Sequence, residues 1–412
     1  MWMHKVVITG MGTINPIAKN TQGFLEGLKE MRSGIDKITQ FDTSDHKVKI
    51  AAEIKDFDPE EYMDRKTAKR YDRFLQLAVA ASDEAIEDAG LSQDQDWREN
   101  AAVIIGSGIG GFKTLYHEFG VMNEKGPKYV SPFLIPMMIA DMASGVVSIR
   151  HKLKGPNFTT VSACASAVHS IISSVMLIRS GEVDVAITGG SEAVIDPMPI
   201  AAFANMMALS QRNDEPQKAS RPFDKDRDGF VMGEGAGILV LESEEHAKAR
   251  GAKIYGYIAG YGMTGDAYHI SQSDPEGEGA ARAIKNALKM AELDPSKVDL
   301  INCHATSTPV GDNSEVKAIK KIFGEFADKP YLQSTKTLIG HTLGAAGAIE
   351  LIASIIESHN HFVHGMPNLE EPDEEMKTLN IPRETQDAEV NVILKNSFGF
   401  GGHNASLIFV KS

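Results

Sequence analysis

The chain has 412 residues, of which 42% are apolar and 24% charged, and this composition excludes both intrinsic disorder and collagen-like repeats. Its 42 Lys and Arg residues against 56 Asp and Glu residues give a net charge of −14, so the field of the whole protein repels nucleic acid and anionic lipid. Only two cysteines, Cys164 and Cys303, occur in this length, which is too few for a disulfide framework and favours a reducing compartment.

Short β-branched runs alternate with helical patterns along the whole chain. Strands are predicted at 6–9, 102–105, 158–162, 183–188, 237–241, 254–259, 298–303, 332–334, 390–395 and 405–410. Helices are predicted at 75–89, 165–179, 279–291, 313–323 and 345–357. This alternation predicts an α/β fold.

The N-terminus and one long uncharged stretch bear on where the protein resides. Residues 1–12 contain a short apolar run broken by glycines and no small-residue cleavage site, so no signal peptide is predicted. Residues 155–178 carry no formal charge over a length that could span a bilayer, but they include Pro156, Asn157 and His169. We interpret this stretch as a buried strand and helix, and we expect a cytoplasmic protein with no membrane partner and no nucleic-acid partner.

The charged stretch 242–251 is the best candidate for a domain boundary in the chain. It predicts an N-terminal half, residues 1–250, and a C-terminal half, residues 251–412. A loose internal repeat supports this division. VVITGMG near the start of the first half has a counterpart in YIAGYGMTGD, and VSACASAVHSIISS has one in LIGHTLGAAGAIELIAS. The repeat predicts two similar halves that share one active site.

Two local motifs suggest cofactor or metal binding, with weaker support. Residues 106–111, GSGIGG, fit the glycine pattern of a dinucleotide-binding turn, but no acidic residue follows at the tip of a next strand. We interpret this loop as a tight turn that lets the backbone approach a bulky group. His359, His361 and His364 lie close in sequence, but no cysteine accompanies them, and we assign them no metal.

Cys164 is the most informative single residue. It follows a predicted strand directly, at the first turn of a helix rich in Ala and Ser. A helix N-terminus favours a thiolate and offers free N–H groups to an oxyanion. The alternative is a buried and inert cysteine.

Two histidines occupy similar turns in the second half. His304 ends the predicted strand 298–303, and His341 lies five residues after Lys336. Together with Cys164 they point to thioester chemistry, with a thiolate nucleophile and imidazole N–H donors to a developing enolate oxygen. A late glycine-rich loop, NSFGFGG, adds Phe398 and Phe400, although its glycines could simply close a turn.

Five long motifs follow one another along the chain: SACASA, RPFDKDRDGFVMGEGAG, HATSTPVGD, STKTLIGHTLGAAGAIE and NSFGFGG. In this ordered set the sequence resembles the condensing enzymes of fatty-acid synthesis, over residues 6–409, and most closely the elongating β-ketoacyl-acyl carrier protein synthase II group. The resemblance implies a thiolase-like fold, in which two similar α/β halves form a five-layered α-β-α-β-α arrangement. It also implies a homodimer.

The resemblance assigns roles residue by residue. The implied catalytic residues are Cys164 as the nucleophile that receives the acyl chain, His304 and His341 as the pair that promotes malonyl decarboxylation, Lys336 as the active-site lysine, and Phe400 as a gate. The backbone N–H groups of Cys164 and Phe400 would form the oxyanion hole. The implied supporting residues are Glu350, which would hold the lysine, Thr306 and Thr308 on the phosphopantetheine arm, and Ile109 and Phe203 in the acyl pocket.

Two positions depart from the usual pattern of that family. Ala305 stands where Gly is usual, and its methyl group lies where the backbone could need an unusual conformation. His403 stands where Thr is common, and it brings a titratable group near Phe400. Neither position removes a catalytic residue, so we expect activity with an altered rate or pH optimum.

Acyl carrier protein is the implied partner, and a basic surface would be needed to dock it. Lys66, Lys69, Arg70 and Arg73 are spaced to fall on one face of a helix in an otherwise acidic protein. Carrier proteins are typically acidic, so we expect these four residues to dock the carrier. The alternative is a solvated charged face.

The implied reaction extends a Cys-bound acyl chain by two carbons, through decarboxylative condensation with malonyl-carrier, and needs no metal or redox cofactor. A stand-alone ketosynthase of polyene or polyketide biosynthesis is the main alternative, because its residues could be the same. A non-catalytic chain-length partner would lack the cysteine that Cys164 supplies. A thiolase would need a second cysteine in the late glycine-rich loop, which has none.

Overall fold

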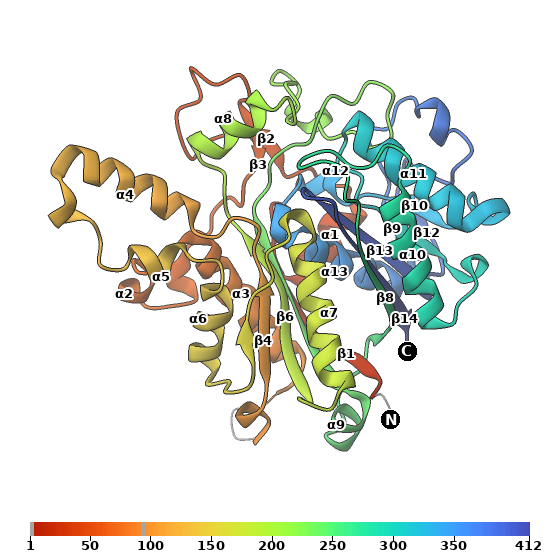
Figure 1. The fold of residues 1–412 in the computed structure, drawn as a ribbon, viewed down its shortest axis with the longest axis horizontal. Helices are drawn as coiled ribbons and strands as arrows, with labels where there is room; N and C mark the ends of the chain where they lie inside the picture. The colour runs from red at the N-terminus through yellow and green to blue at the C-terminus, as the bar shows by residue number, and fades with distance from the viewer. Residues whose placement is uncertain (1–3, 92–95) are drawn as a thin grey trace.

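The computed structural model describes residues 4–91 and 96–412, and within them ten strands form one large sheet (Figure 1). The strand order is β10-β9-β13-β14-β8-β1-β7-β6-β4-β5. The N-terminal part contributes β1 (Val6–Ile14), β4 (Ala102–Gly106), β5 (Asn157–Phe158), β6 (Val185–Glu192) and β7 (Gly235–Ser243). The C-terminal part contributes β8 (Gly256–Gly265), β9 (Leu300–Asn302), β10 (Tyr331–Gln333), β13 (Val392–Gly399) and β14 (His403–Lys411).

The two parts of the sheet repeat one pattern of strand directions. In each part the first and last strands along the chain pair antiparallel, β1 with β7 and β8 with β14. The three strands further out are parallel to one another: β6, β4 and β5 in the first part, and β13, β9 and β10 in the second. The parts meet where β1 and β8 pair at two positions, Val7 with Tyr257 and Ile8 with Gly256. This repetition agrees with the predicted pair of similar halves. The division at residue 250 itself stays a prediction, because the sheet is continuous across it.

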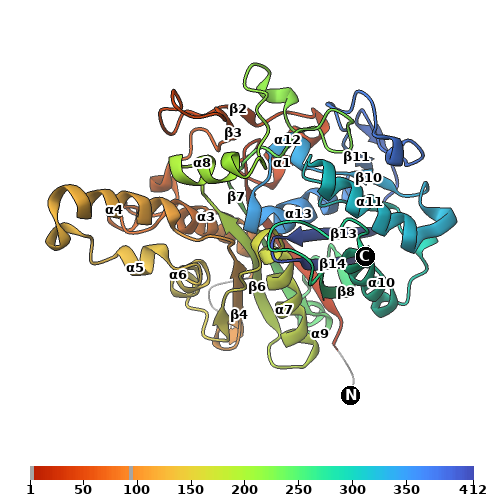
Figure 2. The same ribbon diagram turned by 45° about the horizontal axis from the view of Figure 1, so that its top comes forward.

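Helices form three layers around the two parts of the sheet (Figures 1 and 2). In the middle, α7 (Ser166–Arg179) and α13 (Ala346–His359) pack against each other and against strands of both parts. The outer layers are α3 (Arg73–Asp88) with α6 (Met142–His151) on one side, and α10 (Glu278–Ala291) with α11 (Pro309–Phe323) on the other. The predicted α-β-α-β-α arrangement is therefore confirmed.

The remaining elements are short or peripheral. They are α1 (Thr21–Lys29), α2 (Arg65–Ala68), α4 (Phe112–Lys125), α5 (Leu134–Met138), α8 (Pro197–Asn205), α9 (Glu244–Ala249), α12 (Lys336–Ile339), and the strand pairs β2 (Ile35–Lys37) with β3 (Ile50–Ala52) and β11 (Phe362–Val363) with β12 (Gln386–Asp387). Helices α4 and α5 form an arm that projects from the body (Figure 1). Across the described ranges, every helix is too short or too polar to span a bilayer.

Paired glycines explain the repeated GMG and GYG motifs. A β-carbon on Gly12 would overlap the carbonyl group of Ala81 in α3, and one on Gly262 would overlap the carbonyl group of Ala283 in α10. These glycines let each outer helix lie directly against the first strand of its part. The internal repeat in the sequence therefore reflects the same close packing of a helix on a strand in both parts of the sheet.

One predicted strand is wrong over most of its length. Residues 158–162 were expected to form a strand, but only Phe158 belongs to β5. The following threonines leave the sheet, because Thr159 Oγ1 donates to the carbonyl of Ile105 and Thr160 Oγ1 donates to the carbonyl of Ser166. This departure brings the chain across to the middle layer, where α7 begins.

Candidate active site

Cys164 lies in a tight turn between the edge strand β5 and the buried helix α7. The turn is a 3-10 segment, Ala163–Ala165, in which Ala163 has a φ of +50°, a left-handed conformation that is uncommon outside glycine. Ser166 fixes the turn, because its Oγ accepts from the N–H of Ser162 and donates to the carbonyl of Ala163. The strained turn presents Cys164 at the start of α7, and strain of this kind is common at functional sites.

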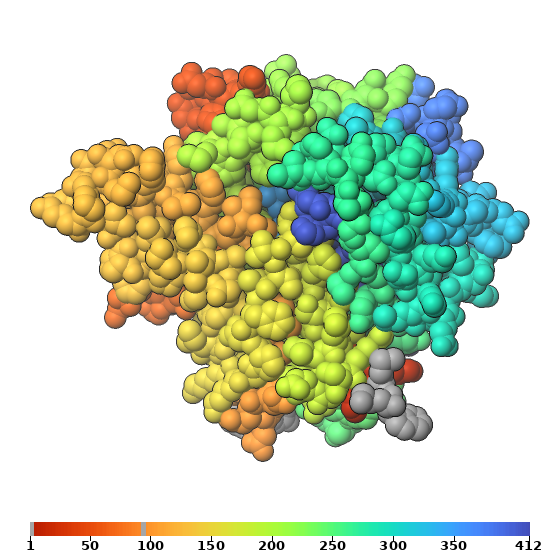
Figure 3. Space-filling view, in the orientation of Figure 1, coloured from red at the N-terminus to blue at the C-terminus, as the bar shows by residue number. Residues whose placement is uncertain are grey.

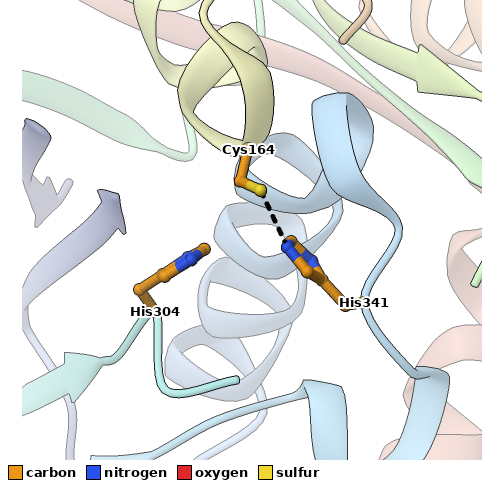
Figure 4. Close-up of side chains that lie close together, drawn as sticks. All are labelled: Cys164, His304 and His341. Atoms are coloured by element: carbon orange, nitrogen blue, oxygen red, sulfur yellow. Dashed lines mark hydrogen bonds between the residues drawn. The ribbon is translucent and has the colours of Figure 1, made fainter. Parts of the chain in front are cut away.

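The second half of the chain brings two histidines to this cysteine (Figure 4). His341 Nε2 and Cys164 Sγ are hydrogen-bonded at 3.0 Å. The rings of His304 and His341 lie edge to face, with centroids 5.3 Å apart. One ligating atom from each of the three residues lies within 4.8 Å of the others, a grouping that could also bind a soft metal ion such as Zn²⁺. The structure thus brings together the three residues on which the sequence interpretation depends.

Burial sets the protonation states of this group. It raises the pKa of the Cys164 thiol to about 12, and the positive charge of Lys336 only partly opposes it. The expectation that the helix N-terminus would leave a thiolate is therefore wrong, because desolvation outweighs it. Burial, reinforced by Lys336, also lowers the pKa of His304 and of His341 well below the ordinary value. At neutral pH the site holds a thiol hydrogen-bonded to a neutral imidazole.

The lysine and glutamate predicted to act together form a buried ion pair. Lys336 Nζ lies 2.5 Å from Glu350 Oε1, and both side chains are almost fully buried. Lys336 begins α12, and Glu350 lies on the middle helix α13. The positive charge of Lys336 faces Cys164, His304 and His341. It lowers the pKa of each of these groups and so favours the deprotonated thiol and the neutral imidazoles.

Two further charged residues of the site were not predicted. Lys395, on β13, lies 2.7 Å from the other carboxylate oxygen of Glu350 and is fully buried. Glu315, on α11, accepts hydrogen bonds from the backbone N–H groups of His304, at 2.9 Å, and Ala305, at 2.7 Å. The sequence signal for Lys395 was a charge at an inward position of the apolar strand 390–395. The signal for Glu315 was an acid on the apolar face of the predicted helix 313–323.

The late glycine-rich loop lies directly against the cysteine turn. A β-carbon on Gly399 would be 2.6 Å from the carbonyl oxygen of Ser162 and 3.1 Å from the backbone nitrogen of Cys164. Phe400 follows Gly399, and its ring centroid lies 6.2 Å from that of Phe203. The backbone N–H groups of Cys164 and Phe400 thus belong to neighbouring segments of the chain.

A cavity of about 410 Å³ opens from the cysteine to the surface. Its lining contains every predicted pocket and arm residue, namely Ile109, Phe203, Thr306 and Thr308, together with Cys164, His304, His341 and Phe400. The hydroxyl groups of Thr306 and Thr308 are hydrogen-bonded at 3.0 Å. Phe230, Met206, Met207 and Val310 also line the cavity and were not predicted. In Figure 3, dark-blue atoms of the C-terminal segment lie in a hollow near the centre of this face.

The glycine loop 106–111 holds a carboxylate of the protein itself. Glu192 is fully buried and accepts from the backbone N–H of Gly108 at 2.7 Å, from that of Ile109 at 3.2 Å, and from the hydroxyl of Ser107 at 2.9 Å. Its carboxylate also accepts from the N–H of Gly344 in the second half, at 3.0 Å. This side chain fills the space that a nucleotide phosphate would need, so the dinucleotide alternative is wrong.

The two departures from the family pattern are accommodated differently. Ala305 is buried, and its φ is not positive, so its methyl group forces no unusual backbone conformation. Its neighbour Ser307 takes the left-handed conformation instead, with a φ of +70°. His403 is exposed at the start of β14, beside Gly401 of the glycine-rich loop.

The basic run does not form one helical face. Helix α2 ends at Ala68, and α3 begins at Arg73, so the predicted spacing is interrupted by a turn. Arg73 is largely buried and pairs with Glu234 at 2.7 Å. The Arg70 guanidinium lies over the ring of Phe133, with 4.5 Å to the centroid. Of the four predicted docking residues, Arg73 is engaged inside the protein, and Lys66, Lys69 and Arg70 are exposed.

Comparisons with known proteins agree with this geometry. Residues 3–247 match the family described as Beta-ketoacyl synthase, N-terminal domain, and residues 255–370 match Beta-ketoacyl synthase, C-terminal domain. The chain is 49% identical to a 3-oxoacyl-[acyl-carrier-protein] synthase 2 from Synechocystis sp., over 99% of this chain and 98% of that protein.

Solved structures with the same fold include two assemblies of ketosynthases. The ishigamide ketosynthase/chain length factor has a TM-score of 0.93 and 34% identity, with both chains covered completely. A type II polyketide-synthase acyl-carrier protein in complex with its ketosynthase gives a TM-score of 0.91 and 30% identity, again over both whole chains.

Proposed function

Because the chain belongs to the β-ketoacyl synthase family, we propose that it acts as a 3-oxoacyl-[acyl-carrier-protein] synthase in which Cys164 carries the growing acyl chain. The observation that carries the residue assignment is the contact of 3.0 Å between Cys164 Sγ and His341 Nε2, at the inner end of an apolar cavity. The polyketide alternative has less support, because the solved ketosynthase of a type II polyketide synthase shares 30% identity with this chain, against 49% for the 3-oxoacyl-[acyl-carrier-protein] synthase 2.

The first step transfers an acyl group from its carrier to Cys164. As the sulfur attacks the thioester carbonyl, its proton passes to His341 Nε2, which is already hydrogen-bonded to it. The backbone N–H groups of Cys164 and Phe400 stabilise the negative charge on the carbonyl oxygen. The carrier thiolate then leaves and takes up the proton from His341.

The second step makes the carbon nucleophile. Malonyl-carrier enters, carbon dioxide departs, and the electron pair of the broken bond becomes an enolate of the remaining thioester. Once Cys164 is acylated, neutral His341 carries its single proton on Nε2 instead of Nδ1, and it and neutral His304 donate N–H hydrogen bonds to the enolate oxygen, a role that their lowered pKa values permit. The enolate carbon attacks the Cys164 thioester, the sulfur leaves as thiolate and takes up a proton, and a 3-oxoacyl-carrier two carbons longer is released. Decarboxylation drives the step, so no metal or redox cofactor is required.

The proposal includes a homodimer. Among the described residues, strand β5 is an edge of the large sheet, and the arm of α4 and α5 exposes large apolar side chains, including Phe119, Tyr129 and Ile135. A second copy would extend the sheet edge and cover these side chains. Sedimentation of the protein at micromolar concentration would measure this, and a monomer mass would contradict it.

The proposal also includes a location and a partner. An acyl carrier protein delivers both substrates, and the exposed Lys66, Lys69 and Arg70 offer it a positive surface. Cys164 and Cys303 are both free, and the reaction requires a reduced thiol at Cys164, which favours the cytoplasm.

Cys164→Ala tests the nucleophile. We expect this variant to lose condensation while it still decarboxylates malonyl-carrier, because the thiol is needed only to hold the acyl group. His304→Ala should accumulate acylated protein and lose decarboxylation, whereas His341→Ala should lose decarboxylation and also acylate more slowly because the thiol has lost its proton acceptor, as mass spectrometry of the intact chain would show. Cys303→Ala is the matched control, since this second buried thiol does not line the cavity. A 3-oxoacyl product from Cys164→Ala would overturn the assignment.

A further inference from the structure

Lys395 is a fully buried lysine in the middle of β13, and the proposed reaction does not use it. Its ammonium group lies 2.7 Å from Glu350 Oε2 and donates to the carbonyl oxygen of Asn396. Burial lowers the pKa of Lys395, whereas Glu350 and Glu315 raise it. Burying a charge destabilises the folded protein unless the charge is paired. A second buried lysine on the same glutamate therefore indicates a function for Lys395.

Four buried charges balance one another behind the histidines. Glu350 forms two ion pairs, one from Oε1 to Lys336 Nζ at 2.5 Å and one from Oε2 to Lys395 Nζ at 2.7 Å. Glu315 supplies the second negative charge, and it accepts from Asn396 Nδ2 at 3.0 Å as well as from the backbone of His304. Removal of Lys395 would leave one buried oxygen of Glu350 without its cation.

The surroundings of the Lys395 ammonium group are oxygen-rich. Asn302 is the register partner of Lys395 on β9, so the two side chains project to the same face of the sheet. Asn302 Oδ1 is buried and has no hydrogen-bond partner within the described residues. A carboxylate oxygen and a backbone carbonyl thus contact a single cation that the chain itself provides, and an unpaired side-chain carbonyl lies on the same face of the sheet.

We propose that Lys395 is a positioning residue for the condensing reaction: it acts as a tethered counter-cation that fixes Glu350, and through it Lys336, behind His304 and His341. The inference rests on the proposed function, since it concerns the same site. Lys395 does not line the cavity and touches no substrate, so its effect reaches the chemistry through the charges that it holds in place.

The effect on pH dependence follows from the groups that face the histidines. His304 faces Lys336, His341 and Lys395, and His341 faces Cys164, Lys336 and Lys395. Each lysine disfavours a protonated imidazole. Without the charge of Lys395 the histidine pKa values rise, so protonation abolishes activity at a higher pH than in the unaltered protein.

The test is Lys395→Met, which keeps an unbranched side chain of nearly the same length and removes the charge. We expect malonyl-carrier decarboxylation to fall about 10- to 100-fold, the range found when a partner that orients an active group is lost. The acid limb of the pH-rate profile should move up by about one unit, as expected for one charge at several ångströms. Lys411→Met is the matched control, because Lys411 bonds the carbonyl of Ser358 at the far end of α13.

A second variant covers a failure of Lys395→Met to fold. Lys395→Ala leaves a hole among oxygen atoms, and ethylammonium chloride should restore activity about tenfold or more, whereas tetramethylammonium chloride at equal ionic strength should not, because it cannot donate a hydrogen bond. A folded variant with an unchanged acid limb and rate would overturn the inference, as would failure of both variants to fold in ethylammonium. If the unaltered protein does not decarboxylate malonyl-carrier, the proposed function fails instead.

Discussion

Gly399→Ala adds one methyl group at the contact between the glycine-rich loop and the cysteine turn. The new β-carbon would lie 2.6 Å from the carbonyl oxygen of Ser162, where an ordinary contact needs at least 3.4 Å. The φ of Gly399 is not positive, so alanine is not excluded by backbone conformation. The loop must therefore move away from Cys164 by several tenths of an ångström.

The size of that movement determines how much the rate of Cys164 acylation should fall. Groups that take part in a reaction tolerate displacements of about 0.5 Å from their working positions. The difference between the 2.6 Å contact and an ordinary contact of 3.4 Å is larger than this tolerance. Loss of one oxyanion donor typically costs about 100- to 1,000-fold in rate, or about 3 to 4 kcal/mol. Because the proposed mechanism uses the Phe400 N–H as such a donor, we expect acylation of Cys164 by acyl-carrier to slow about 100-fold in Gly399→Ala.

The assay compares two reactions of one thiol. Transfer of an acyl group from its carrier needs the oxyanion hole, whereas alkylation by iodoacetamide does not. Gly399→Ala should slow the first reaction and leave the second nearly unchanged. Gly265→Ala is the control, since Gly265 lies at the same end of the sheet and a β-carbon there meets no atom within 4 Å. Acylation at the unaltered rate in a normally folded Gly399→Ala protein would refute the reasoning.

Two other predictions concern the acyl chain and its carrier. Ile109→Phe should shift products toward shorter chains, because Ile109 lines the cavity and overpacking an apolar channel costs about 1 to 3 kcal/mol; acylation rates across a series of chain lengths would measure this, and an equal loss at every length would indicate a general folding defect. Lys66→Glu with Lys69→Glu should raise KM for carrier-bound substrate and flatten its salt dependence, because both residues are exposed on α2 and its C-terminal turn. An unchanged KM at low ionic strength would place docking elsewhere.

Regular periodicity made the framework of the fold predictable. The helices α3, α7, α10, α11 and α13 and most long strands lie within a few residues of their predicted ranges, whereas β1 and β8 continue to Ile14 and Gly265, past their predicted ends at residues 9 and 259. Helix α8 was missed because its sequence is apolar on all sides and begins with proline. The strand pairs β2 with β3 and β11 with β12 were missed because two or three residues carry no period.

The basic run shows how local capping overrides a pattern of charges. Asp64 caps α2 by accepting from the N–H of Lys66, and Asp72 caps α3 by accepting from the N–H of Phe74. Two aspartates eight residues apart therefore mark two helix starts, although the basic side chains alone are spaced for one helix. Attention to the capping residues would have separated Arg73 from Lys66.

The residues proposed to be catalytic could be picked out because they stand in long motifs, whereas the buried charges behind them could not. Lys395 and Glu315 act through contacts between strands and helices that are distant in sequence, and spacing along one chain does not report such contacts. The protonation state of Cys164 was misjudged for a related reason. A helix N-terminus is visible in sequence, but the depth of burial that raises the pKa of the thiol to about 12 is not.

The carboxylate of Glu192 joins the glycine loop of the first half to Gly344 in the second half. The reactive sulfur comes from the first half, and both imidazoles and the ammonium of Lys336 come from the second. Neither half therefore contains the whole site by itself. A substitution that separates the two halves would abolish turnover even though every reacting side chain is still present in the chain.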